Sequence, residues 1–359
     1  MTLSDFDYNL PPELIAQTPS EPRDASRLLV VPRHDQRCEH RHFHDLPEYL
    51  RPGDLLVLNQ TRVIPARLKG HKIPTGGALE LLLLRQRAAT TWVALVGGKR
   101  ICVGTQLAVQ NTAEQTIQAE VIEVLDGAQR VVQFEAPINA QLADFGEIPL
   151  PPYIHEPLAD PERYQTVFAR QEGSAAAPTA GLHFTGDMLI NLRKAGIEIA
   201  YCTLNIGLDT FQPVHEEEIE QHVMHSEWAT LTAKDAQIIN EAKLAGRRVI
   251  AVGTTVVRTL ESAAILSAGG DPAQGQLPPT DSCPWRPVTA FEQETKLFIR
   301  PGYNFRVIDG MITNFHLPKS TLLMLVSAFV GRERALAAYQ TAIQERYRFY
   351  SFGDAMLIL

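Results

Sequence analysis

Residues 247–266 read RRVIAVGTTVVRTLESAAIL, which is typical of a strand that turns directly into a helix. The run VIAV has the apolar, β-branched character of a buried strand. Gly253 interrupts this run, and apolar side chains then recur at helical spacing. A buried strand followed at once by a helix is the unit of folds in which helices cover a sheet.

The same alternation continues on both sides of this stretch. Thr185 and Thr232 each precede a helical pattern and are expected to cap it, and Ser320 precedes an apolar helix. Alternation of this kind predicts a sheet covered by helices. The expected helices lie at residues 185–195, 233–245, 256–266, after Ser320 and at 333–347, and the expected strands at 197–204, 247–252, 296–300 and 311–315.

Residues 54–135 have a different rhythm, with short β-rich runs separated by turn formers and no helical pattern between them. Many close-spaced strands favour a small barrel or sandwich, because closure removes exposed edges. The runs lie at residues 55–59, 66–71, 78–84, 90–96, 106–110, 119–125 and 130–136.

A proline-rich connector, IPLPPYIHEPLADP at residues 148–161, follows the β-rich region, and its X-Pro steps favour extended backbone. A chain of 359 residues also exceeds what one core usually serves. The predicted fold class is therefore α/β. A helix-covered mixed sheet domain at residues 1–61 plus 151–359 carries an inserted all-β, barrel-like domain at residues 62–150.

The composition is that of a globular cytoplasmic protein, with 45% hydrophobic and 21% charged residues. The N-terminal residues lack a signal-peptide pattern, and no run reaches the ~18 uncharged apolar residues of a membrane span. We therefore expect no membrane partner. The four cysteines are scattered, which favours a reducing compartment over a disulfide framework or a thiolate zinc site.

The net charge of −8 weighs against a nucleic-acid partner, because phosphate contacts usually require a basic surface. Short basic groups nevertheless interrupt the acidic background, including Arg247 with Arg248 and Arg346 with Arg348. Composition alone leaves open whether they are solvated charges or converge on one face.

The turn Gly253-Thr254-Thr255 is a candidate ligand site. A helix start leaves backbone N–H groups unpaired beside the positive end of the helix dipole, and two hydroxyls add donors. A carboxylate or phosphate would be held well there. The alternative is a plain threonine N-cap. No dinucleotide-binding or P-loop glycine pattern occurs in the required context, so Rossmann-type cofactor binding has no support.

Histidines in turns are the candidates for acid/base chemistry, because imidazole titrates near neutral pH. His183 follows the small-residue segment GSAAAPTAGL, and His316 lies just past an expected strand. His225 with Glu227, in MHSEW, is a candidate oriented pair. For each of these residues the alternative is a hydrogen-bonded turn position.

Two histidine patterns raise the question of a metal. HRHFH at residues 40–44 places three histidines on one face of an extended segment, and His222-x-x-His225 places two on one helical face. Neither has a cysteine or carboxylate at a recognised ligand spacing. We therefore predict no metal site and no metal requirement.

Taken together, the segments resemble the S-adenosylmethionine:tRNA ribosyltransferase-isomerase family of queuosine biosynthesis. The resemblance covers nearly the whole chain in one order and is loosest at residues 85–146 and 267–291. The blocks include LPPELIAQTPSEPRDASRLLV, GDLLVLNQTRVIPARLKG, GSAAAPTAGLHFT, RVIAVGTTVVRTLES, IRPGYNFRVIDGMITNFHLPKSTLLMLVSAFVG and YRFYSFGDAMLI.

This sequence departs from the family pattern in one block. The expected LHVGxGTFQPV reads LNIGLDTFQPV, with Asn205 in place of histidine and Asp209 in place of glycine. Aspartate tolerates positive φ better than most residues. Either the family does not depend on these positions, or this protein is altered there.

The resemblance implies a concrete reaction with S-adenosylmethionine as co-substrate. Its ribosyl moiety is transferred and isomerised onto the aminomethyl group of 7-aminomethyl-7-deazaguanine at the tRNA wobble position. Epoxyqueuosine forms, and adenine and methionine leave. The sulfonium acidifies the adjacent protons, so the site needs a base, an acid, an anion pocket and a stacking surface. The implied partner is tRNA, and the protein is expected to be a monomer.

Roles for the candidate residues follow from these needs. Arg258 has a helix-surface ion pair as its alternative role, and the aromatic residues have core packing. The assignment is His183 and His316 as acid and base, His225 and Glu227 in reserve, Thr254 and Thr255 for the methionine carboxylate or a phosphate, Arg62 and Arg258 for anionic charge, and Tyr350 or Phe352 for stacking.

Two other functions stay open. An S-adenosylmethionine-dependent RNA methyltransferase would be expected to carry a glycine-rich first strand–helix turn, which this chain lacks. A non-catalytic RNA-binding protein would be expected to be less acidic.

Overall fold

The computed structural model contains two compact units. Unit 1 comprises Met1–Gln60, Pro152–Ala169 and Pro178–Leu359, and unit 2 comprises Thr61–Pro151 with Arg170–Ala177. The structure describes residues 1–34, 37–125, 127–207, 217–222, 224, 226–278, 283 and 285–359. The segment Arg170–Ala177 lies outside the predicted inserted domain and groups with unit 2 because its strand pairs there.

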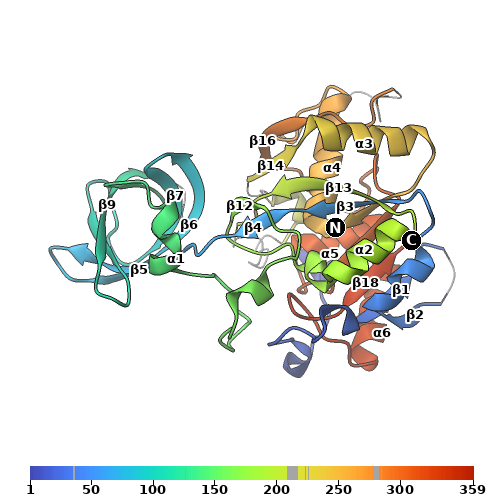
Figure 1. The fold of residues 1–359 in the computed structure, drawn as a ribbon, viewed down its shortest axis with the longest axis horizontal. Helices are drawn as coiled ribbons and strands as arrows, with labels where there is room; N and C mark the ends of the chain where they lie inside the picture. The colour runs from blue at the N-terminus through green and yellow to red at the C-terminus, as the bar shows by residue number, and fades with distance from the viewer. Residues whose placement is uncertain are drawn as a thin grey trace. The chain divides into compact units, whose positions relative to one another are not determined.

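Unit 1 is built on a nine-stranded mixed sheet, which confirms the predicted α/β class (Figure 1). Strands β13, β3, β15 and β17 form one parallel group, and β18 and β1 form a parallel pair that joins this group through an antiparallel pairing of β17 with β18. The outer strands β14, β16 and β2 are antiparallel to their neighbours. The order is β16 (Phe291–Thr295), β14 (Glu227–Leu231), β13 (Glu198–Leu204), β3 (Leu55–Asn59), β15 (Val249–Val252), β17 (Gly310–Asn314), β18 (Ala355–Ile358), β1 (Arg27–Val31) and β2 (Glu39–His42).

The central strand β3 is buried on both faces, which explains its uninterrupted apolar run. Leu55 and Val57 pack on one face with residues of α3 (Ala233–Leu244), α4 (Thr254–Ser267), α5 (Thr321–Val330) and α6 (Arg332–Gln344). Leu56 and Leu58 pack with Phe184, Met188 and Leu192 on the other. This run opens the β-rich region of the sequence, yet the fold uses it in the large sheet.

Three of the expected helix caps are present. Thr185 Oγ1 accepts from Met188 N, Thr232 Oγ1 from Asp235 N, and Ser320 Oγ from Leu323 N, all at 3.1–3.2 Å. Each bond satisfies an N–H group that the first helical turn leaves unpaired. The helices are α1 (Leu142–Phe145), α2 (Gly186–Lys194), α3 (Ala233–Leu244), α4 (Thr254–Ser267), α5 (Thr321–Val330) and α6 (Arg332–Gln344).

The strand predicted at residues 296–300 is wrong. The strand is β16, which ends at Thr295, and both backbone groups of Leu297 bond to side chains instead. Leu297 N donates to Thr295 Oγ1 at 3.2 Å, and its carbonyl accepts from Arg258 Nε at 3.2 Å. Because both its N–H and its carbonyl group are occupied, Leu297 cannot pair with a neighbouring strand.

Unit 2 contains a closed six-stranded barrel, which confirms the barrel-like prediction (Figure 1). Pairing of β5 with β8 closes it, and Gly70 lies at that crossing, where a Cβ would come within 2.2 Å of Ala108 O. The order is β5 (Arg67–Ile73), β6 (Ala78–Ala88), β7 (Thr91–Gly97), β10 (Gln129–Phe134), β9 (Thr116–Val124) and β8 (Gln106–Gln110); β11 (Gly146–Glu147) joins β5, and β4 (Thr61–Val63) pairs with β12 (Gln171–Ser174).

Among the helices formed by the described residues, none is both long enough and apolar enough to cross a membrane.

Candidate active site

The carboxyl ends of β3, β13, β15 and β17 meet at one edge of the unit 1 sheet. The chain enters β13 from α2, which packs on one face, and leaves β15 into α4, which packs on the other. In open α/β sheets, ligands bind outside the carboxyl ends of the strands where the connections change face. This edge is therefore the place to look for the site.

The turn after β15 depends on glycine. Gly253 has φ 95°, a left-handed conformation that favours glycine, and a Cβ there would lie 3.6 Å from Ala180 Cβ. Gly253 is itself the N-cap of α4, and no side-chain hydrogen bond caps this helix. The alternative of a plain threonine N-cap is thus wrong, because Thr254 and Thr255 occupy the first helical positions and are buried.

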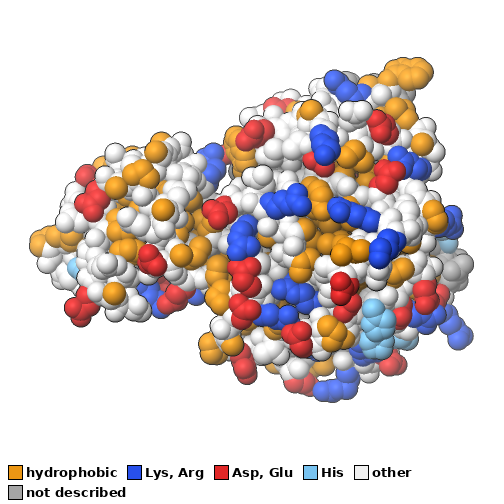
Figure 2. All heavy atoms as spheres, viewed as in Figure 1, with side chains coloured by type: hydrophobic (Ala, Val, Ile, Leu, Met, Phe, Trp, Pro, Cys, Tyr) orange, Lys and Arg blue, Asp and Glu red, His pale blue; other side chains and the backbone are white. Residues whose placement is uncertain are grey.

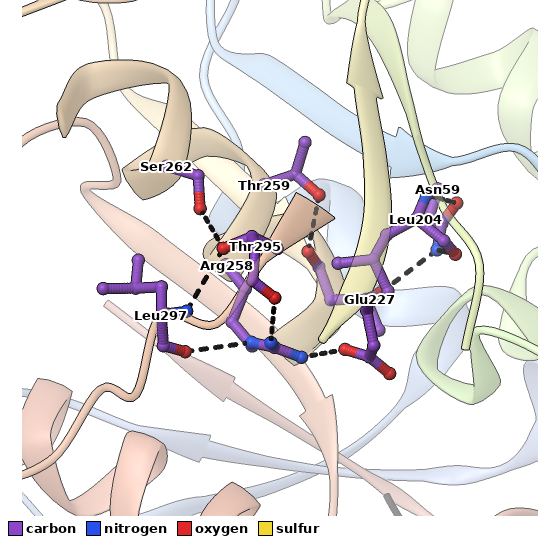
Figure 3. Close-up of polar contacts among 9 residues, drawn as sticks. Asn59, Leu204, Glu227, Arg258, Thr259, Ser262, Thr295 and Leu297 are labelled. Carbon is purple, nitrogen blue, oxygen red and sulfur yellow. Dashed lines mark hydrogen bonds and ion pairs between the residues drawn. The ribbon is translucent and has the colours of Figure 1, made fainter. Parts of the chain in front are cut away.

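Asn59, the last residue of β3, connects the end of β13 with the start of α4 (Figure 3). Its amide nitrogen donates to Leu204 O at 3.0 Å and to Thr255 Oγ1 at 3.3 Å, and its Oδ1 accepts from Leu204 N at 3.1 Å. This side chain therefore fixes both the end of β13 and the Thr255 hydroxyl.

Glu227 and Arg258, two of the candidate residues, form a buried ion pair with each other (Figure 3). The Arg258 Nε donates to Leu297 O at 3.2 Å, and Nη2 lies 3.5 Å from Thr295 O. Burial lowers the pKa of Arg258 to about 10, so the guanidinium remains charged at neutral pH. Its positive charge is compensated within the protein.

His183 ends the 3₁₀ helix η7 (Thr179–His183) and is 5% exposed. Its ring stacks on Phe43 with centroids 4.9 Å apart, and its nitrogens lie 2.7 Å from Ser26 Oγ and 3.2 Å from Asn314 Nδ2. The Asn314 amide also donates to Tyr350 O at 3.1 Å, which sets its orientation. Nε2 of His183 is therefore an acceptor, and Nδ1–H donates to Ser26.

The protonated form of His183 is strongly disfavoured. Burial, followed by the nearby charges of Arg348 and Arg23, lowers the pKa of His183 to about 3. At neutral pH the imidazole is therefore neutral and carries one proton, on Nδ1.

A small open pocket of about 20 Å³ lies against His183. Residues from three separate parts of the chain form its walls, and each part belongs to one of the blocks that resemble the family. The lining residues are Pro19, Ser20, Arg23, Leu182, His183, Ser351, Phe352 and Gly353.

Two arginines beside this pocket were not among the candidate site residues. Arg23 lines the pocket, and Arg348 donates to the carbonyl of Phe352, another lining residue. Arg348 was noted only within a basic group, and Arg23 carries no distinguishing pattern. The one signal in the sequence is that both lie in long family-like blocks.

His316 lies just past β17, two residues after Asn314. Its Nε2 is 2.7 Å from Thr313 Oγ1, and its backbone N donates to Tyr339 OH at 2.9 Å. Its carbonyl accepts from Tyr8 OH. Burial lowers the pKa of His316 to about 3. His316 is not among the pocket-lining residues.

The two aromatic candidates have different surroundings. Phe352 lines the pocket and meets Tyr164 edge to face at 5.7 Å. Tyr350 is buried, has φ 69°, and packs on Tyr153 with ring centroids 4.7 Å apart. Phe352 is therefore the candidate that shares a wall with His183.

Two candidate residues and the two departures from the family pattern remain. Arg62 lies on β4 in unit 2. His225 and the departure Asp209 lie outside the described residues. The other departure, Asn205, directly follows β13, and its backbone N donates to Trp228 O at 3.0 Å.

The segment HRHFH forms a cluster that sequence spacing did not show. His42 and His44 stack with centroids 5.3 Å apart, and Asp45 completes a group whose possible ligand atoms all lie within 4.8 Å. His40 instead bonds to Tyr347 OH at 2.9 Å. Asp45 supplies the carboxylate that the sequence interpretation did not consider, and it also accepts from His42 N as a helix cap.

Known proteins resemble this chain along its whole length. A family model described as a queuosine biosynthesis protein matches residues 3–358. Relatives named S-adenosylmethionine:tRNA ribosyltransferase-isomerase are 54% identical in Moorella thermoacetica and 49% in Desulforamulus reducens, each with 100% of both chains covered.

A solved structure agrees with these matches. The crystal structure of S-adenosylmethionine tRNA ribosyltransferase from Thermotoga maritima is 37% identical, covers 99% of this chain and 100% of its own, and superposes with a TM-score of 0.55. With the family model and the relatives in agreement, this chain belongs to the family of queuosine biosynthesis proteins.

Proposed function

We propose that this chain transfers and isomerises the ribosyl moiety of S-adenosylmethionine onto 7-aminomethyl-7-deazaguanine at the wobble position of tRNA. The observation that carries the proposal is the full-length identity of 54% to a relative named for this activity. The assembled pocket supports it, because three family-like blocks, far apart in the sequence, meet around His183.

The proposed reaction requires a base that removes a proton from the carbon beside the sulfonium. His183 and His316 remain the candidates, and their low pKa values specify which role is open to them. Both are in the base form at neutral pH, so neither holds an ionisable imidazolium proton to give. The acid that protonates the departing adenine is therefore a different group or the imidazolium that forms when one of these histidines removes the proton.

The Thr254 turn is the proposed contact for the methionine carboxylate or for a tRNA phosphate. It lies at the carboxyl edge of the parallel strands, and its helix start has no side-chain cap to compete for the backbone N–H groups. Asn59 already donates to Thr255 Oγ1, which leaves the hydroxyl proton free to point elsewhere.

We further propose that the enzyme acts on tRNA as a cytoplasmic monomer without a metal. Support for an RNA partner comes from the relatives' names and from the surface. On the visible face of unit 1, lysine and arginine side chains lie across the middle, despite the net charge of −8 (Figure 2). Light scattering at several protein concentrations tests the monomer.

The products distinguish this function from its alternatives. With isotope-labelled S-adenosylmethionine and tRNA carrying the modified base, we expect labelled methionine, adenine and a ribosyl-derived adduct in the digested nucleosides. S-adenosylhomocysteine with a methylated nucleoside would instead identify a methyltransferase. RNA binding without any turnover would identify a non-catalytic binding protein.

A further inference from the structure

Two guanidinium groups border the His183 pocket and donate to neutral oxygens. Arg23 Nη1 donates to Gln165 O at 2.7 Å and Nη2 to Glu162 O at 3.0 Å. Arg348 Nη2 donates to Thr18 O at 2.5 Å and to the carbonyl of Phe352. Backbone carbonyls orient both groups without cancelling their charge.

Nearby carboxylates offset part of the charge of both arginines: Glu21, Asp160 and Glu162 act on Arg23, and Asp354 acts on Arg348. Among the described residues neither Arg23 nor Arg348 forms a salt bridge, and Glu21 pairs with Arg163 at 2.8 Å. Asp354 attracts Arg348, but its two oxygens accept from Arg27 N at 2.9 Å and Arg348 N at 2.7 Å.

The electrostatic environment of the pocket wall is correspondingly positive. The charged neighbours that influence the pKa of His183 are Arg348 and Arg23, and both disfavour its protonation. Positive charge that is only partly compensated beside a half-buried pocket attracts an anion more strongly than the same charge on a fully solvated surface does.

We propose that the pocket between Arg23 and Arg348 is an oxyanion subsite, which receives one oxygen of a carboxylate or phosphate. The cavity of about 20 Å³ has room for at least one water-sized group, which is the size of one such oxygen. The guanidinium fork matches either oxyanion. The identity of the physiological oxyanion rests on the proposed function. It is the methionine carboxylate of S-adenosylmethionine or a tRNA phosphate.

The first test needs no knowledge of the reaction. Inorganic phosphate should bind the wild-type protein, shift the ring resonances of His183, and raise the melting temperature with increasing concentration. Arg348→Gln and Arg23→Gln should each weaken this binding about 10- to 100-fold. Arg247→Gln is the control, because Arg247 is already paired with Glu198 at 2.5 Å.

Arg23 also donates hydrogen bonds to backbone carbonyl groups, so its replacement could disturb the local structure. Arg23→Lys keeps the charge and separates the two contributions, and the unfolding temperature of every variant is measured beside its affinity. Phosphate affinity unchanged in folded Arg348→Gln and Arg23→Gln, or equally weakened in Arg247→Gln, would overturn the subsite.

The source of the oxyanion is tested with two further ligands. If the carboxylate enters, wild type should bind S-adenosylmethionine about 10- to 100-fold tighter than its decarboxylated analogue, and Arg348→Gln should erase the difference. If a tRNA phosphate enters, the salt dependence of tRNA binding should lose about one unit of slope in Arg348→Gln. An effect on neither ligand would refute a substrate role.

A failure of the proposed function can be distinguished from a failure of the oxyanion subsite. Wild-type protein that releases no methionine and adenine would refute that function, while the inorganic phosphate titration would still decide whether the subsite exists.

Discussion

Two regions of unit 1 hold arginine in opposite ways. Arg258 is buried in α4, its charge is compensated by Glu227, and its other donors reach Leu297 and Thr295. Arg23 and Arg348 beside the pocket have carbonyl partners and no salt bridge among the described residues. The first arrangement is complete without a ligand, whereas the second leaves positive charge beside an open cavity.

The presence or absence of a salt bridge distinguishes a structural arginine from a ligand-binding one, although the sequence alone does not tell them apart. A buried guanidinium must be compensated where it lies, because desolvating an unpaired charge is costly. A half-exposed one at a cavity wall can remain uncompensated, because water solvates it until a ligand arrives. The residues around each arginine therefore decide its role.

The largest expected effect is in the pocket region. If His183 removes the proton, His183→Ala should lower turnover by about 10²–10⁴-fold, as is typical of the loss of a general base. Binding of S-adenosylmethionine should change little, because the lost interaction acts mainly in the transition state. Single-turnover rates and equilibrium binding measure the two quantities.

His316→Ala is the matched comparison, since its ring has a similarly low pKa but does not line the pocket. Wild-type turnover in folded His183→Ala would remove His183 from the mechanism. Loss of co-substrate affinity with normal turnover would make it a binding residue.

Mutation of the Glu227–Arg258 ion pair should change the stability of the protein rather than its turnover. Glu227→Ala leaves the Arg258 charge buried and unpaired, and should lower the free energy of unfolding by about 3–5 kcal/mol. Glu198→Ala, which removes the partly exposed partner of Arg247, should cost only about 0–1 kcal/mol. Denaturant melts measure both variants.

Activity then separates the two roles of Glu227. Full stability with abolished turnover in Glu227→Ala would contradict a structural pair and restore Glu227 as a catalytic candidate.

Acidification tests the pocket histidine through the pH dependence of stability. His183 and His316 have folded-state pKa values near 3, below the ordinary 6.5. A depressed histidine pKa contributes stability that is fully present above about pH 6.5 and is lost as the pH falls toward 3. In that window each histidine should lower the free energy of unfolding by up to about 1.4 kcal/mol for every pH unit of acidification.

His183→Gln and His316→Gln should therefore each flatten the acid side of the stability curve relative to wild type. The comparison with wild type cancels titrating carboxyl groups, such as Asp354 with its pKa raised by burial. Parallel curves for His183→Gln and wild type would show that folding does not lower the pKa of His183.

Periodicity predicted the architecture because it reports which faces are buried. The barrel, the helix caps at Thr185, Thr232 and Ser320, and the strand–turn–helix at Gly253 depend on local patterns of this kind. The strand predicted at residues 296–300 failed because side chains distant in sequence, above all Arg258, take the backbone groups there.

The site was harder to predict because its members are joined only by tertiary structure. His183 was named from its turn, but Ser26, Asn314 and Arg23 meet it from other parts of the chain. Arg258 and Glu227 were named for separate roles, yet they bind each other. Charge compensation between distant residues leaves no trace in local spacing.

The smallest expected effect concerns metal, and neither arginine region provides a ligand set. The described residues contain one candidate group, His42, His44 and Asp45, with both histidines exposed. Asp45 already accepts from His42 N at 2.9 Å, and the two rings stack on each other, which accounts for the cluster without an ion. Dialysis against a chelator should therefore leave turnover unchanged within error. Turnover lost on dialysis and restored by a divalent ion would contradict this prediction. His44→Gln would then show whether the ion acts at this cluster, with His40→Gln as the control, because His40 is bonded to Tyr347 instead.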